Sequence, residues 1–330
     1  MNKIRFGVIG TNNITQWFLN GSKNCDRFSL TAIYSRSKEK ALEFGDKYGV
    51  TTLFTDLEEM AKSDLIDAVY IASPNALHCE QTILFLNNNK HVLCEKAFAS
   101  NAKEVNIMIE VAKNNNVILM EAMKTTVLPN FKAIKNNIHK IGKVRKYFAS
   151  YCQYSSRYDK YKEGIILNAF NPKLSNGALM DIGVYTIHPM VNLFGKPNSL
   201  KASSVMLDSG IDGEGSIIFK YDELEGVVMY SKISNSYLPS EIQGENGSII
   251  IDNIHNFQNV KIVFRDGREE ELSIEQLDDD MYYEIEEFIN IIQEKKEESQ
   301  TNTLNNSKIV AELMEETRKQ IGLVFPADLK

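Results

Sequence analysis

Hydrophobic positions in the first 123 residues alternate between two patterns. Short apolar runs rich in β-branched residues predict strands at 3–10, 28–35, 67–73, 90–96 and 117–123. Between these runs, apolar residues recur three and four positions apart and predict helices at 14–24, 38–49, 76–89 and 102–116. Strands that alternate with helices form parallel sheets, because each parallel connection needs a crossover. We therefore predict an α/β, doubly wound parallel sheet as a first domain over residues 1–123.

The remaining residues, 124–330, show a different pattern. Period-2 alternation predicts a strand at 143–156, and apolar runs separated by turn signals such as "ENGS" and "RDGR" predict further strands at 200–207, 213–221, 224–233, 247–253 and 259–274. Helical spacing recurs at 130–142, 281–296 and 306–322. Strands joined by short turns predict a mostly antiparallel sheet, so we expect a second, α+β domain over 124–330.

Composition and charge narrow the class of protein. The chain has 330 residues, of which 43% are hydrophobic and 25% charged, as in globular proteins. A net charge of -7 argues against a nucleic-acid partner. We see no apolar run of membrane-spanning length, no signal peptide, and no spacing of the four cysteines that suggests a disulfide framework or zinc site. A soluble, reduced, cytoplasmic protein with a small-molecule ligand is expected.

The stretch "GVIGTNNIT" follows the first predicted strand and opens a helix. A dinucleotide-binding turn has the pattern G-x-G-x-x-G. Gly10 fills the first glycine position, while Asn12 and Thr15 hold the second and third. Asn is the residue other than glycine that best tolerates the left-handed conformation, so Asn12 is compatible with such a turn. From these residues alone, a nucleotide-binding turn and an ordinary strand-to-helix corner both remain open.

The second strand ends in "YSRSKEK", where a cofactor with a free ribose 2'-hydroxyl usually meets an acidic residue. Here the chain offers Ser35, Arg36, Ser37 and Lys40, a set that suits a 2'-phosphate. This favours NADP over NAD. The alternative is that Ser35 or Ser37 caps the next helix and Arg36 is a solvated charge.

Polar residues also follow later strands of the predicted sheet. In parallel sheets, ligands bind at the carboxyl ends of the strands. His78 of "IASPNALH" could contact a ligand or pack in the interior. Glu95 and Lys96 of "CEKAFASN" are adjacent charges at this edge, and Glu121 follows the last strand. Buried charges are costly unless they are paired or used, although an ordinary ion pair would also explain them.

In this order and spacing, "GVIGTNNIT", "YSRSKEKA", "ASPNALH", "CEKAFASN", "MEAM" and "NGALMDIGVYTIHPMVNLFG" resemble the glucose–fructose oxidoreductase/inositol dehydrogenase family, Gfo/Idh/MocA. The pattern around Tyr185 is more similar to the dihydrodiol dehydrogenase and glucose–fructose oxidoreductase branches than to inositol dehydrogenases. The resemblance implies an amino-terminal Rossmann domain and a carboxy-terminal domain with a large, open, mostly antiparallel sheet. It further implies hydride transfer between NAD(P) and a secondary hydroxyl or carbonyl of a sugar-, polyol- or diol-like molecule. The family commonly forms homodimers or homotetramers through that sheet.

The resemblance also implies that "GVIGTNNIT" is a cofactor-binding turn and not an ordinary strand-to-helix corner. Residues implied to contact the cofactor are Gly10, Thr11, Asn12, Asn13, Ile14, Ser35, Arg36, Ser37, Lys40, Ser73, Asn75, His78, Glu95, Lys96 and Glu121.

The motif "NGALMDIGVYTIHPM" carries the chemistry of the second half. If it is helical from Ala178, then Asp181, Tyr185 and His188 share one face, with a kink expected near Pro189. The resemblance assigns Tyr185 as acid/base, Lys96 as its cationic partner and Asp181 to orient Lys96 or bind hydroxyls. His188 is the backup acid/base or a structural or substrate contact, and a polar cluster between domains remains an alternative. No metal site is expected, because Asp181 and His188 alone are too few ligands.

Other residues before this motif could line a substrate pocket: Tyr154, Arg157, Asn168 and Asn171. Two further functions remain open beside the dehydrogenase. One is a glycoside hydrolase that retains its nicotinamide, as some relatives do, and the other is a non-catalytic NAD(P) sensor on the same fold.

Overall fold

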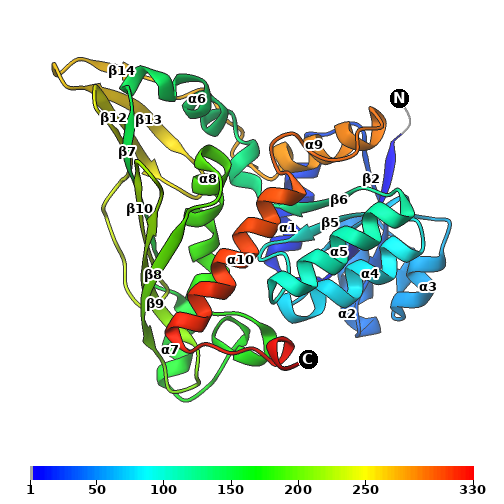
Figure 1. The fold of residues 1–330 in the computed structure, drawn as a ribbon. Coiled ribbons are helices and arrows are strands. Elements are labelled where there is room, and N and C mark those ends of the chain that lie inside the picture. The colour runs from blue at the N-terminus through cyan, green and yellow to red at the C-terminus, as the bar shows by residue number, and fades with distance from the viewer. Residues whose placement is uncertain (1–2) are drawn as a thin grey trace. The chain divides into compact units, whose positions relative to one another are not determined.

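A computed structural model describes residues 3–330, which form two compact units (Figure 1). The first unit comprises the described part of Met1–Lys124 together with Leu277–Ser307, and the second comprises Thr125–Gln276 and Lys308–Lys330. The first junction falls within one residue of the predicted boundary at 123/124. The predicted second domain, however, is not continuous, because residues 277–307 pack with the first unit.

The first unit contains a parallel sheet of six strands in the order β3-β2-β1-β4-β5-β6, with every pairing parallel. The strands are β1 (Ile4–Ile9), β2 (Phe28–Tyr34), β3 (Leu53–Phe54), β4 (Ala68–Ile71), β5 (His91–Glu95) and β6 (Leu119–Ala122). The predicted doubly wound sheet is confirmed. The strand order reverses between β1 and β4, where such sheets bind their ligands.

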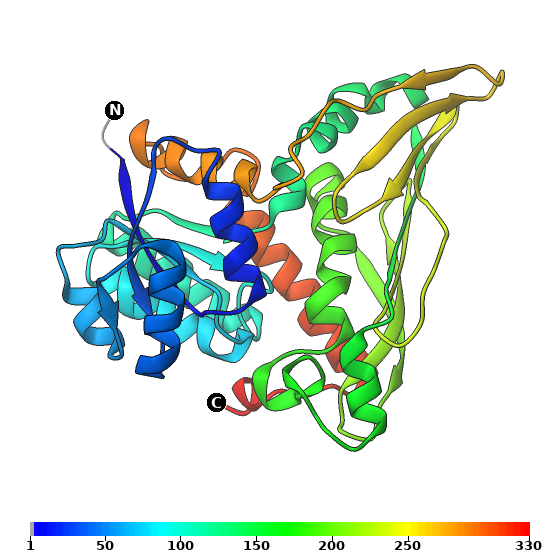
Figure 2. The same cartoon turned by 180° about the vertical axis from the view of Figure 1, so that it is seen from behind.

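Helices cover both faces of this sheet (Figures 1 and 2). They are α1 (Asn13–Ser22), α2 (Lys38–Tyr48), α3 (Leu57–Lys62), α4 (His78–Asn87), α5 (Ala102–Asn115) and α9 (Tyr282–Gln293). On one face α1 and α9 lie side by side, and on the other α4 packs against α5. The sequence pattern did not predict β3 or α3, whose two and six residues are too few for a clear period.

Helix α9 is part of the core of the first unit. Ile285, Phe288 and Ile289 are fully buried in the same cluster as Phe6 and Phe28 of the sheet. The Phe288 and Phe6 rings lie 5.9 Å apart between centroids. The apolar face that the sequence predicts for this helix therefore closes over the amino-terminal sheet.

The second unit contains a sheet in the order β14-β13-β12-β11-β7-β10-β9-β8. The strands are β7 (Val144–Cys152), β8 (Ser199–Met206), β9 (Asp212–Lys220), β10 (Glu225–Ser231), β11 (Ser240–Gly244), β12 (Gly247–Asn253), β13 (Gln258–Phe264) and β14 (Glu269–Glu271). Its pairings are antiparallel apart from β7 with β10, so the predicted mostly antiparallel sheet is confirmed. Strand β11 was not predicted, because "SEIQG" is short and mostly polar.

Helices of the second unit cover one face of its sheet (Figure 1). The α-helices are α6 (Pro129–Asn137), α7 (Ser156–Lys162), α8 (Val184–Phe194) and α10 (Leu304–Ile321), and a π-helix, Leu179–Gly183, precedes α8. Short 3-10 turns occur in both units, at Asn75–Leu77, Lys124–Val127, Ile138–Ile141, Asn168–Phe170, Pro172–Leu174 and Pro326–Leu329. Within residues 3–330, no helix has the length and hydropathy needed to cross a membrane.

The opposite face of the second sheet carries a row of apolar side chains. The strand register places Ile218, Val227 and Phe148 next to one another across β9, β10 and β7. The charged Glu241 of β11 lies between Phe148 and Ile250 of β12 and interrupts the apolar row there. Ile218 is 48% exposed, so this row forms an apolar surface on the unit.

Candidate functional site

The turn after β1 requires the glycine at position 10. Gly10 has a φ of +106°, and a Cβ atom there would lie 2.8 Å from the carbonyl oxygen of Ala72 at the end of β4. Any other residue would therefore be strained and would collide with the neighbouring strand. The prediction that Gly10 forms this turn is confirmed.

Asn12 has a role that differs from the expected one. Its φ of −95° is not left-handed, so the tolerance argued from the sequence is not used. Instead Asn12 is the N-cap of α1: its Oδ1 accepts a hydrogen bond from the Thr15 backbone N–H at 3.2 Å. Its Nδ2 donates to the Ala72 carbonyl at 3.0 Å. The side chain expected to crowd a phosphate is thus tied to β4, and Thr11, Asn13 and Ile14 flank it at the amino end of α1.

The polar residues that follow β2 form the amino end of α2. Ser37 is the N-cap of α2, accepting from the Lys40 backbone N–H at 3.3 Å, and Ser35 Oγ accepts from the Ser37 N–H at 3.3 Å. Arg36 and Lys40 are exposed beside this cap. The capping role of Ser37 is confirmed. Glu39 also lies here: the Ser37 hydroxyl donates to its carboxylate at 2.7 Å and lowers the pKa of Glu39.

His78 connects two loops at the ligand-binding edge of the sheet. It is fully buried, and its Nε2 and Nδ1 lie 2.8 Å and 2.9 Å from the carbonyl oxygens of Ser73 and Ala97. Burial lowers its pKa. The neutral imidazole has one N–H and donates it to one of these two carbonyl oxygens, and both ring nitrogens face the protein interior. This supports the packing role that the sequence left open and argues against the cofactor contact.

Glu95 and Lys96 end β5 in different environments. Glu95 is buried, and its carboxylate accepts from the Tyr70 hydroxyl at 2.5 Å and from the Lys96 backbone N–H at 3.2 Å. Burial raises the pKa of Glu95, and the Lys96 ammonium opposes that rise. Lys96 itself is only half-buried. Glu95 is therefore a structural anchor, whereas Lys96 is the accessible charge at this strand end.

Glu284 of α9 is a buried carboxyl that sequence reasoning missed. It is fully buried, and neither carboxyl oxygen has a hydrogen-bond partner among residues 3–330. Burial, reinforced by the nearby Glu95 carboxyl, holds the pKa of Glu284 well above its ordinary value. Helical spacing could have found it, because Glu284 lies four residues before buried Phe288 on the same face.

The remaining predicted cofactor residues lie near the same edge. The Ser73 hydroxyl donates to Gln81 Oε1 at 2.7 Å. Asn75 and Glu121 are buried, with exposures of 8% and 2%. Asn302 donates to the backbone carbonyl of Met123 at 3.0 Å, so the returning segment 277–307 also secures the end of β6.

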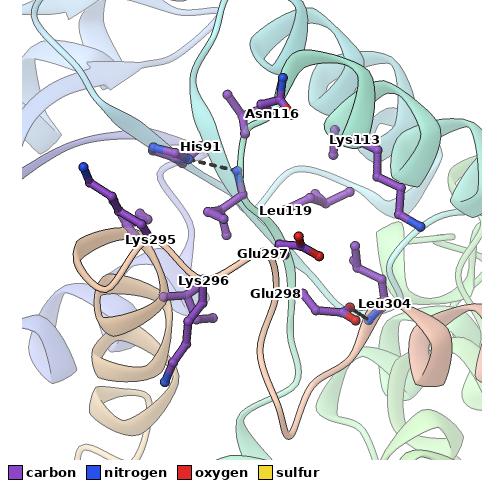
Figure 3. A pocket seen from close by; sticks show the side chains of 14 residues that line it. His91, Lys113, Asn116, Leu119, Lys295, Lys296, Glu297, Glu298 and Leu304 are labelled. Carbon is purple, nitrogen blue, oxygen red and sulfur yellow. Dashed lines mark hydrogen bonds between the residues drawn. The ribbon is translucent and has the colours of Figure 1, made fainter.

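A cavity of about 730 Å³ lies at the opposite edge of the sheet (Figure 3). It is lined where β5 and β6 begin, at His91 and Leu119, and by the carboxyl ends of α5 and α9. His91 Nδ1 accepts from the Ile118 N–H at 2.9 Å there. The cavity is therefore distinct from the predicted cofactor edge, which lies at the other ends of these strands.

In the second unit, Asp181 and Tyr185 lie on a helix whose first part is a π-helix. The expected continuous α-helix from Ala178 is wrong: Asp181 belongs to the π-helix and Tyr185 to the first turn of α8. Helix α8 continues through Pro189 to Phe194. Asp181 and Tyr185 are half-buried, whereas His188 is fully buried, which favours a structural role for His188. π-Helical turns are frequent at functional sites.

Lys232 is a second functional candidate that sequence reasoning missed. It follows β10, and its Nζ donates a hydrogen bond to Asp181 Oδ2. The Lys232 side chain is 4% exposed and that of Asp181 is 32% exposed. The sequence offered no signal for this pair, because the two residues lie 51 positions apart. From the sequence, we expected Asp181 to orient Lys96 or to bind substrate hydroxyls. Lys232 is an additional hydrogen-bond partner of Asp181.

Aromatic side chains hold the Tyr185 ring. Tyr151 of β7 contacts it edge-on at 5.7 Å between centroids. Tyr151 in turn stacks on His255 at 4.8 Å and 9°. The position of the Tyr185 hydroxyl is therefore set by packing within the second unit.

The predicted pocket loop folds partly as α7. The Tyr154 hydroxyl donates to Asp159 Oδ1 at 2.7 Å, and Arg157 and Asn168 are exposed. Asn171 caps the next turn, accepting from the Lys173 N–H at 3.0 Å. These contacts give Tyr154 and Asn171 structural roles, and leave Arg157 and Asn168 accessible.

Asp212 of β9 anchors the start of the π-helix. It is fully buried, and its Oδ2 accepts from the Leu179 backbone N–H at 2.6 Å. Burial raises the pKa of Asp212 to about 6. A Cβ at Gly177 would lie 2.0 Å from Asp212 Oδ1, so this anchor also requires glycine there. No group of three or more His, Cys, Asp or Glu side chains within residues 3–330 is arranged to hold a metal ion.

Comparison with known proteins accounts for both units. Residues 4–123 match the model of the oxidoreductase family with an NAD-binding Rossmann fold, and residues 133–250 match the GFO/IDH/MocA C-terminal domain. The chain belongs to the Gfo/Idh/MocA family. It is an NAD(P)-dependent oxidoreductase, as its motifs predicted.

Individual Gfo/Idh/MocA relatives refine this result. The chain is 58% identical to the scyllo-inositol 2-dehydrogenase (NADP(+)) IolU of Bacillus subtilis, over 98% of this chain and 99% of that one. It is 28% identical to a trans-1,2-dihydrobenzene-1,2-diol dehydrogenase of Danio rerio, over 98% and 99% of the two chains. The dihydrodiol branch suggested by the Tyr185 pattern is thus related, but the inositol dehydrogenase is much more similar.

A solved structure shows the same Gfo/Idh/MocA fold. It is KijD10, a 3-ketoreductase from Actinomadura kijaniata in complex with NADP and TDP-benzene. Its TM-score is 0.84 at 22% identity, covering 97% of this chain and 98% of that one.

Proposed function

We propose that this protein is an NADP-dependent dehydrogenase that oxidises a secondary hydroxyl of a cyclic polyol or vicinal diol, and reduces the corresponding ketone. The observation that carries the proposal is the 58% identity, over nearly the whole of both chains, to an NADP(+)-dependent scyllo-inositol dehydrogenase. The chemical groups at the strand ends support it: a glycine turn, a helix amino end and an exposed guanidinium at the end of β2.

The residues at the cofactor edge fit a phosphorylated dinucleotide. Gly10 keeps the backbone of the first turn free of a Cβ. The amino end of α1 follows this turn directly, and a helix amino end is a favourable position for a pyrophosphate. We propose that Arg36, with Ser35, Ser37 and Lys40, binds the 2'-phosphate. When bound, the nicotinamide supplies the hydride acceptor or donor.

We propose that Tyr185 moves the hydroxyl proton. Oxidation of CH–OH to C=O removes a hydride from carbon and a proton from oxygen, so a side chain must accept that proton. A free tyrosine has a pKa of about 10 and needs a nearby cation to act at neutral pH. Lys96 is proposed to supply the cation and to hold the substrate oxygen, and Asp181 to accept hydrogen bonds from neighbouring hydroxyls.

Steady-state assays of the purified protein test this function. We expect NADP⁺ reduction with scyllo-inositol or another cyclic polyol, and a loss of kcat of at least about a hundredfold in Tyr185→Phe and Lys96→Met. NADPH affinity of Tyr185→Phe should stay within about twofold of wild type, because its backbone and ring are unchanged. Tyr237→Phe, at a residue that is 95% exposed, is the matched control. Wild-type turnover by Tyr185→Phe would exclude its proposed role.

We also propose that the protein forms homodimers or homotetramers through the apolar row of the second sheet. One face of that sheet is not covered by a helix of the same unit in Figures 1 and 2. Ile218 is exposed and Val227 and Phe148 are half-buried, whereas their neighbours along each strand are buried. Val227→Glu should give a monomer in analytical ultracentrifugation, with Lys103→Glu, at an exposed position of α5 in the first unit, as the control. A cytoplasmic location stays a prediction, supported by four free thiols.

A further inference from the structure

A buried ammonium group lies behind the half-exposed carboxylate of Asp181. Lys232 has 4% of its side chain exposed, compared with 32% for Asp181, and its Nζ donates to Asp181 Oδ2. The Lys232 ammonium also lies 5.2 Å from the centre of the Phe170 ring. Burying an ammonium costs several kcal/mol unless it is well paired. Because the Lys232 ammonium is buried and Asp181 is not, Lys232 can affect a ligand through its effect on Asp181.

The backbone of Lys232 is held from two sides. Its N–H donates to the Gly213 carbonyl of β9 at 2.9 Å, and its carbonyl accepts from the Ser155 N–H at 2.9 Å. Asp212, one residue before Gly213, accepts from the Leu179 N–H at 2.6 Å. Strand β9 thus fixes both the start of the π-helix and the lysine that holds Asp181.

The charges around this pair determine what it presents to a ligand. Asp212 is a second carboxyl that interacts with the Lys232 ammonium, and it is fully buried. Glu214 is engaged by the hydroxyls of Ser231 and Ser234, at 3.2 Å and 3.1 Å. The accessible part of the pair is therefore the Asp181 carboxylate, while the cation stays inside.

We propose that Lys232 is a positioning residue that holds Asp181 ionised and in one orientation, so that Asp181 accepts hydrogen bonds from the hydroxyls of a neutral polyol. The proposal rests on the proposed function and deepens it by naming a determinant of substrate class. A carboxylate that faces the substrate repels anions. Sugar acids should therefore be poorer substrates than the neutral polyols of the same size.

The test combines kinetics with a readout that does not need turnover. Lys232→Met removes the charge at similar length, and should raise KM for the polyol at least about tenfold with kcat changed by less than about threefold, because a ground-state contact is lost. Lys232→Arg should restore most of the affinity. Asp181→Asn combined with Lys232→Met should lose little more than Asp181→Asn alone, because one residue acts through the other. Lys220→Gln, an exposed lysine of β9, is the matched control.

Carboxyl-carbon NMR of the isotopically labelled protein separates this inference from the proposed function. The Asp181 signal, assigned with Asp181→Asn, should titrate at higher pH in Lys232→Met than in wild type. If Lys232→Met does not fold, Lys232→Gln takes its place, because its amide still donates to Asp181. An unchanged titration of Asp181 in a folded variant would overturn the inference. Absence of polyol oxidation by wild type would overturn the proposed function instead, and the titration would then decide the role of Lys232.

Discussion

The side chain of Asn12 joins the first turn of the sheet to Ala72, 60 residues later, through a hydrogen bond of 3.0 Å to its carbonyl oxygen. The same side chain caps α1 through the Thr15 N–H. Asn12 therefore replaces a glycine of the dinucleotide pattern, and its side chain is directed to the end of β4 and the first turn of α1.

Changing Asn12 should cost stability and should not improve cofactor binding. Asn12→Ala removes the cap and the bond to Ala72, so the free energy of unfolding should fall by about 1 to 2 kcal/mol. Asn12→Gly restores the glycine pattern, yet NADPH affinity by fluorescence titration should not rise. An affinity at least about threefold tighter in Asn12→Gly would mean that the asparagine side chain obstructs the phosphate.

Arg36 should determine the preference between the two nicotinamide cofactors. Its exposed guanidinium lies beside the Ser37 cap, and charge-assisted contacts to a phosphate are worth about 1.5 to 3 kcal/mol. Arg36→Ala should therefore weaken NADPH binding by about 10- to 100-fold and change NADH binding little. Lys38→Ala, at an exposed cation that begins α2, is the control. Equal losses for both cofactors would argue against a 2'-phosphate contact.

Asp212 should make stability depend on pH in a direction unusual for an aspartate. Burial raises its pKa to about 6 from the ordinary 3.8, so the folded state binds the proton more tightly than the unfolded chain. Its contribution to stability is present below pH 3.8 and is lost as the pH rises through about 6. Relative to Asp212→Asn, wild type should gain about 2 to 3 kcal/mol between pH 8 and pH 4.

Urea unfolding of both proteins at the two pH values measures this difference. Subtracting Asp212→Asn removes the contribution of the other titrating groups. The prediction would be falsified if the difference between the two proteins stayed constant with pH.

Phe288 should stabilise the amino-terminal sheet although it lies near the other end of the chain. It is fully buried and packs 5.9 Å from the Phe6 ring. Phe288→Ala should lower the free energy of unfolding by about 3 to 5 kcal/mol and weaken NADPH binding. Tyr237→Ala, at a position 95% exposed, should change neither. If the two variants unfold alike, α9 does not belong to that core.

Local patterns predicted most of the fold. The six-stranded sheet was predictable apart from β3, because strands buried on both faces are apolar along their whole length. Gly10 was predictable as well, since a tight turn between a strand and a helix requires it. The pattern could show that α9 has an apolar face, but periodicity does not identify the surface against which that face packs.

The parts of the candidate site that escaped prediction depend on contacts between distant positions. Lys232 and Asp181 are 51 positions apart, and neither strand nor helix spacing connects them. The π-helix was missed because its sequence has the apolar spacing of an ordinary helix, and the added width of its turn follows from anchors such as Asp212. The role of His78 was not predictable from the sequence for the same reason, because the two carbonyl oxygens that it faces lie in different loops.

Helix α9 belongs to the core of the first unit, but it is synthesised after most of the second unit. The first unit therefore cannot complete its core until this late segment has been made. Strand β6 ends at Ala122, but Tyr282 begins the helix that closes the same core. At usual translation rates, the ribosome needs about ten to thirty seconds to make the intervening segment. During that interval the nascent sheet exposes the apolar surface that α9 later covers. An unfinished chain therefore carries exposed apolar surface until residues 282–293 have been made.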